Sequence, residues 1–149
     1  MPQFRESRFF SVLAVFCMIS FIGLVTASSA PDDTVGKQMR KVKKAMKTLH
    51  KIAADPAQKS AAMEAASSLQ SAALAAKGLL PRNAKRMEDP KAKAEFIAGF
   101  RKAQIAFIKT SLDLELAIMD GDKDKVATLL QALEGMEQRG HKTFKKRRQ

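Results

Sequence analysis

Three short sequences that interrupt helices divide the chain after residue 33 into four segments. Asp55-Pro56 and Asp89-Pro90 each join a residue that caps a helix N-terminus to one that fits its first turn. Asp120-Gly121-Asp122 joins a helix stop to a new cap, and Gly78 with Pro81 marks another helix end. The sequence therefore predicts helices over about 33–54, 56–77, 90–119 and 122–144.

The predicted helices carry apolar residues at steps of three and four, which is typical of a helix with one buried face. The absence of Trp and Tyr and the abundance of Ala, Leu and Lys disfavour a sheet. Because the connections are short, we expect an all-α, antiparallel up-down-up-down four-helix bundle. The predicted core positions are Val35, Met39, Val42, Met46, Leu49 and Ala53 in the first helix, Phe96, Phe100, Ala103, Phe107 and Leu114 in the third, and Val126, Leu130, Leu133 and Phe144 in the fourth.

The first thirty residues have the order of a secretory signal peptide. Arg5 and Arg8 precede an apolar run over 9–27, which ends in small residues. We expect a signal peptide over 1–27, cleaved near Ala27 to Ala30, and a bundle domain over 31–149 with no membrane span after cleavage. The alternative is an uncleaved membrane anchor, since the run approaches the ~20 residues that a spanning helix needs.

The chain is strongly basic, with 27 Lys and Arg against 15 Asp and Glu and a net charge of +12. An exported basic protein favours partners with acidic docking surfaces. Nucleic acid is disfavoured as a partner, because the chain has no Trp or Tyr for stacking and begins with an export signal. One Cys and two His exclude a zinc module. We also find no nucleophile–base pair, carboxylate dyad or phosphate loop, so the sequence gives no support for an enzyme.

In the expected bundle, two potential metal ligands come to a similar height at one end. Met39 lies about two turns into the first helix, and His141 lies one to two turns before the end of the fourth. Phe96 and Phe100, early in the third helix, lie at that height too. Each residue also has a simpler explanation, since Met and Phe commonly fill cores and a His near a helix C-terminus complements the helix dipole.

A Met thioether and a His imidazole are the axial ligands of iron in low-spin, electron-transferring haem proteins. Both strong ligands together leave no open coordination position for a substrate. No Cys-x-x-Cys-His sequence is present, so a haem here would be a non-covalent haem b, one per chain. The predicted metal ligands are Met39 and His141, and Phe96 and Phe100 are the predicted walls of the haem pocket.

After the expected signal peptide, the sequence resembles the cytochrome b562 family of periplasmic electron-transfer proteins over nearly its whole length. The resemblance rests on Met39 with its apolar stripe, on 71–77 followed by Pro81, on Phe96-Ile97-Ala98-Gly99-Phe100, and on the position of His141. It implies a monomeric or weakly associating periplasmic carrier of single electrons. It does not identify the redox donor or acceptor, or the reduction potential.

Three residues need separate interpretation. Glu137 stands where the family has a basic residue and is expected to face inward, near a propionate, beside a Lys or Arg, or toward solvent at the bundle end. Gly140 stands where the family has a larger residue, which loosens the last turn before His141. His50 lies ~16 Å along the first helix from Met39, so the two cannot bind one iron. We interpret His50 as a polar residue at the core boundary, with a second metal site as the alternative.

A haem-free exported bundle with a structural or chaperone-like binding role is the rival hypothesis. It accounts for the apolar stripes and for the charge. It leaves the shared height of Met39, His141 and the two Phe residues to chance.

Overall fold

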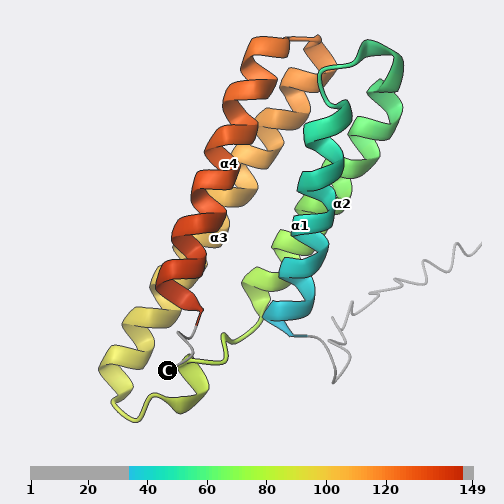
Figure 1. The fold of residues 1–149 in the computed structure, drawn as a ribbon. Helices are drawn as coiled ribbons and strands as arrows, with labels where there is room; N and C mark the ends of the chain where they lie inside the picture. The colour runs from blue at the N-terminus through green and yellow to red at the C-terminus, as the bar shows by residue number, and fades with distance from the viewer. Residues whose placement is uncertain (1–33, 146–149) are drawn as a thin grey trace, which may run out of the picture.

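The computed structural model describes residues 34–145, which form four α-helices, two single turns of 3-10 helix and no strand. The helices form a four-helix bundle (Figure 1). The predicted signal peptide over 1–27 and its cleavage site lie outside the described residues. No helix within 34–145 is both long enough and apolar enough to cross a membrane. The elements are α1 Val35–Ile52, η1 Pro56–Gln58, α2 Lys59–Gly78, η2 Ala84–Arg86, α3 Pro90–Asp120 and α4 Lys123–Phe144.

The aspartates that the sequence marks as N-caps do cap their helices, whereas Gly78 is the last residue of α2 and Leu79 is its C-cap. The side chain of Asp89 accepts the backbone N–H of Lys91 at the start of α3, and that of Asp122 accepts the N–H of Lys125 at the start of α4. Gly121 has a φ of 73°, a left-handed conformation that glycine adopts without strain and that ends α3. The second segment differs from the prediction, because residues 56–58 form η1 and the α-helix begins only at Lys59.

The helices lie in two adjacent pairs, α1 with α2 and α3 with α4 (Figure 1). Consecutive helices make most of the interhelical contacts, whereas α1 and α4 touch at few points. At one end of the bundle, Lys59 on α2 donates from Nζ to the backbone oxygen of Met119 near the end of α3, at 2.6 Å. At the other end, a longer connection over 79–89 links α2 to α3.

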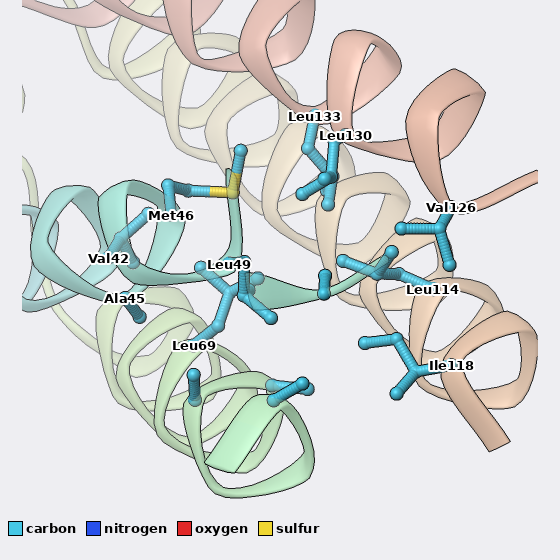
Figure 2. Packing of buried hydrophobic residues seen from close by; sticks show 14 of the residues in the cluster. Val42, Ala45, Met46, Leu49, Leu69, Leu114, Ile118, Val126, Leu130 and Leu133 are labelled. Carbon is cyan, nitrogen blue, oxygen red and sulfur yellow. The ribbon is translucent and has the colours of Figure 1, made fainter. Parts of the chain in front are cut away.

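One hydrophobic cluster joins the four helices. Figure 2 shows labelled side chains from every helix gathered in this cluster, with Leu49, Leu69, Leu114 and Leu133 among the most deeply buried. Small residues dominate the buried face of α2, which has six buried Ala and one buried Leu. This composition lets the backbone of α2 approach its neighbours closely. Most of the predicted core positions are buried, and Val35, Met39, Phe96, Ala103 and Phe144 are half-buried.

Candidate functional site

A cavity of about 1510 Å³ opens at the end of the bundle away from the contact of Lys59 with Met119. Its walls come from the first turns of α1, the connection after α2, the middle of α3 and the last turns of α4. Pockets for drug-sized molecules commonly measure ~300–1,000 Å³, so this cavity has room for a larger ligand.

Both predicted metal ligands line this cavity. Met39 reaches it from α1, where its half-buried side chain also packs against the hydrophobic cluster. His141 reaches it from α4, and 43% of its side chain is exposed. The structure thus brings Met39 and His141, which are 102 positions apart in the sequence, into the walls of one cavity.

The two predicted aromatic residues occupy different positions relative to the cavity. Phe100 is buried and lines it. Phe96 is not a lining residue, but its ring packs edge-on against Phe144 of α4, which does line the cavity. The rings of Phe96 and Phe100 each lie 5.4 Å from that of Phe144 between centroids. Phe144, which the sequence predicts only as a core residue of α4, is therefore the aromatic centre of this wall.

The end of α4 is fixed to the connection between α2 and α3. Asn83 donates from Nδ2 to the backbone oxygen of Phe144, at 3.2 Å, and both residues line the cavity. The last four carbonyls of a helix have no partner within the helix, so this hydrogen bond supplies one. It positions the last turn of α4, which carries His141, relative to the loop on the opposite wall.

Glu137 lies one turn before His141 and faces the same cavity. Its Oε1 atom is 3.3 Å from Nε2 of His141, and only 17% of its side chain is exposed. The carboxylate is directed inward, as expected, but its partner is His141 itself. None of the ion pairs formed within 34–145 joins Glu137 to a Lys or Arg.

The cavity has an apolar interior and a basic rim. Phe100, Phe107 and Met136 contribute apolar surface, and Phe107 belongs to the hydrophobic cluster. Against the single carboxylate of Glu137, the lining includes the cationic residues Arg40, Lys43, Arg82, Lys85, Arg86, Arg139 and Lys145, which we call the basic rim. The sequence shows the high net charge of the chain but does not predict that these seven residues lie together, because they come from three separate segments.

His50 lies outside the cavity. Its Nε2 atom is 2.9 Å from Oε1 of Glu134 on α4, and both side chains are partly exposed. This contact is one of the few direct links between α1 and α4. It agrees with the interpretation of His50 as a polar boundary residue.

The donor set in the cavity fits an iron-bound haem b. One thioether and one imidazole are the protein ligands that such an iron takes in low-spin cytochromes, and the apolar interior with a basic rim suits a flat apolar ring with two carboxylates. Residues 34–145 contain no group of three or more His, Cys, Asp or Glu side chains that could hold a metal ion by themselves. No protein-family model matches the sequence, and no curated protein matches it significantly.

Proposed function

We propose that this protein is an exported, periplasmic electron carrier that binds one non-covalent haem b, as the resemblance to the cytochrome b562 family implies. Met39 and His141 would be its axial ligands. The observation that carries the proposal is the presence of both side chains, with buried Phe100, in the walls of one cavity of sufficient size.

The proposal includes an up-down-up-down order in which consecutive helices are antiparallel. The residues of the cavity support this order, because the start of α1 and the end of α4 line the cavity together with the connection after α2. A second, small pocket at the other end is lined by 53–56 and Lys59 together with 118–121, Lys123 and Val126. The short connections at 53–55 and 121–122 require the same arrangement.

The contact of His50 with Glu134 gives the relative heights of the two proposed ligands. Met39 lies eleven residues before His50, and His141 lies seven residues after Glu134. In antiparallel helices both ligands lie on the same side of that contact, and their heights differ by four residues, or about 6 Å. Two side chains that extend from facing helices can span this offset with a metal between them.

The protein's own groups define what the site can do. A bound haem b would supply a single-electron iron(III)/iron(II) couple. Met39 and His141 would hold the iron, and two strong protein ligands would suit electron transfer rather than catalysis. A thioether ligand and the apolar surface of Phe100 and Phe107 would favour the reduced, less charged state of the haem and so would raise its potential.

The basic rim serves two purposes in this proposal. Carboxylates of the bound group would lie near Arg and Lys side chains, which form strong hydrogen bonds with anions. The same positive charge at the mouth of the cavity would attract the acidic surface of a redox partner and accelerate their encounter at low salt.

The test is an absorption spectrum of the purified protein with haem added at increasing ratios, oxidised and then reduced with dithionite. Uptake of one haem per chain, with narrow, separate α and β bands after reduction, is the expected result for two strong axial ligands. Met39→Ala and His141→Ala should each abolish this low-spin spectrum while the far-ultraviolet circular dichroism remains helical.

Matched controls separate ligation from general damage to the cavity. Met136→Ala changes another methionine that lines the same cavity, and His50→Ala changes the other histidine. Both should keep the low-spin spectrum. A protein that takes up no stoichiometric haem would contradict the proposal and leave the haem-free binding bundle as the better hypothesis.

A further inference from the structure

Helix α3 carries a row of large apolar side chains that the bundle does not cover. Ile105, Leu112, Leu116 and Met119 are each about half exposed, between 46% and 54%. At ~100° per residue the four lie within about 60° of one another around the helix, on one face. The row extends over fourteen residues, or about 21 Å. Single exposed apolar residues are ordinary on a protein surface, but an aligned row of this length indicates a surface that another helix covers.

Four charged residues flank this row on one side, two Lys followed by two Asp. When a second helix runs in the opposite direction, its order is two Asp followed by two Lys, so opposite charges can face each other. Lys102, Lys109, Asp113 and Asp120 lie about 40° to 80° from Ile105 in the same direction around the helix, and all four are exposed. Lys102 and Asp120 are each nine residues from position 111, and Lys109 and Asp113 are each two residues from it. None of the ion pairs within 34–145 uses any of these four side chains.

We infer that the apolar row is a dimer interface, in which α3 packs antiparallel against α3 of a second copy of this chain about a twofold axis near position 111. In antiparallel helices related by such an axis, the charged flank of one α3 faces the charged flank of the other. Lys102 then lies opposite Asp120 of the second copy, and Lys109 lies opposite Asp113. The twofold axis repeats each pair, so each of these four charges meets an opposite charge.

The apolar residues agree with the same register. Leu112 lies beside the axis, where it meets its own counterpart, and Ile105 falls between Leu116 and Met119 of the second copy. In a parallel pair, by contrast, each residue would face the other flank at its own height, and the order of two Lys followed by two Asp would have no function. The charge order therefore selects a second copy in antiparallel orientation as the occupant of this surface.

The interface lies apart from the cavity, and none of the four apolar residues of the row lines it. The inference consequently does not depend on haem binding. It specifies the weakly associating alternative of the sequence-based expectation as a symmetric pair of low affinity, because one helix face provides a small interface.

Sedimentation of the purified protein over a wide concentration range tests the dimer. The mass should rise toward twice that of one chain as concentration increases. Leu112→Asp should remain a monomer throughout, whereas Leu74→Asp, at an exposed leucine of α2 outside the row, should dimerise as the parent does. A parent protein that stays monomeric up to millimolar concentration, or a Leu112→Asp variant that still dimerises, would overturn the inference.

A charge exchange tests the register. Lys109→Asp places two carboxylates opposite each other at two symmetric positions, so we expect dimer affinity to fall about tenfold. Lys109→Asp combined with Asp113→Lys restores both pairs with reversed sign and should recover the affinity. Failure of the double variant to recover it would rule out the pairing of these residues.

Disulfide trapping tests the orientation. With Cys17, the chain's only cysteine, replaced by serine, Leu112→Cys should form an intermolecular disulfide under mild oxidation. Ile105→Cys, equally exposed on the same row, should not, because in the antiparallel pair its own counterpart lies far along the helix. Equal trapping of both variants would indicate a parallel pair and would overturn the antiparallel arrangement.

Discussion

The carboxylate of Glu137 and the imidazole of His141 are paired across one turn of α4, with Oε1 3.3 Å from Nε2. Both side chains face the cavity, and the paired ring nitrogen is one of only two that could bind a metal. Glu137 therefore competes with any ligand that needs Nε2 of His141. It also places a negative charge beside an otherwise basic rim.

Replacement of Glu137 by Ala should strengthen haem binding. The variant no longer has to break a hydrogen bond that contributes about 1 kcal/mol, which corresponds to roughly fivefold in the dissociation constant. Titration followed at the Soret band measures the change. Glu134→Ala removes a carboxylate of α4 that lies outside the cavity and should leave the affinity unaltered. Equal haem binding by Glu137→Ala would show that Glu137 does not compete for the site, and weaker binding would show that it supports the site.

The contact of His50 with Glu134 should make a small contribution to stability. Both side chains are partly exposed, and such pairs contribute about 0.2–1 kcal/mol. A double-mutant cycle with His50→Ala and Glu134→Ala in urea unfolding isolates the coupling between them. A coupling free energy indistinguishable from zero would mean that this contact does not hold α1 and α4 together.

Two leucines of α2 should differ sharply in their contribution to the core. Leu69 is fully buried, so Leu69→Ala should lower the free energy of unfolding by about 2–5 kcal/mol. Leu74 is 56% exposed, and Leu74→Ala should have little effect. Urea unfolding of both variants is the measurement, and comparable losses would contradict the burial seen in the structure.

Two glycines should respond in opposite directions to substitution by alanine. Gly140 lies inside α4 with free space around the position of a Cβ atom, so Gly140→Ala should stabilise the protein by about 0.5–1 kcal/mol. Gly121→Ala should destabilise it, because the left-handed φ of 73° is strained for alanine. Thermal unfolding of the two variants compares them directly, and a loss of stability in Gly140→Ala would contradict the prediction.

The N-cap of η1 should be sensitive to acid. The side-chain amide of Gln58 and the backbone N–H of Ala57 donate to the Asp55 carboxylate, and both lower the pKa of Asp55 below its ordinary value. Because the folded pKa is the lower one, the stabilisation is present above the ordinary pKa and is lost as the pH falls through the folded value. A carboxyl NMR titration should find a higher pKa for Asp55 in Gln58→Ala, and an unchanged pKa would exclude the Gln58 hydrogen bond as the main cause.

Helix boundaries were the most predictable part of this fold, because caps and breakers act locally. Asp89, Gly121 and Asp122 determine their boundaries through hydrogen bonds and φ values of adjacent residues. The 3-10 turn at 56–58 was not predicted, since Asp55-Pro56 is compatible with either kind of helix start. A helical wheel also predicts most of the buried residues, because the apolar face of each helix packs against the other helices.

The cavity was predictable only in part. The similar height expected for Met39 and His141 rests on helix lengths and short connections, and both residues line one cavity. The pairing of Glu137 with His141 depends on a choice among side-chain rotamers, and the basic rim depends on how three distant segments come together. Neither is encoded in local spacing. Sequence reasoning therefore leaves three alternatives for Glu137 and does not predict the basic rim.

The residues that fold this protein and the residues that line its cavity are largely different sets. Leu49, Leu69, Leu114 and Leu133 hold the hydrophobic cluster and are absent from the cavity, while Phe107 is the main buried side chain common to both. Substitutions of the exposed residues that line the cavity therefore carry little cost in folding. Over evolutionary time such a bundle can exchange one ligand for another while its scaffold stays under constant selection.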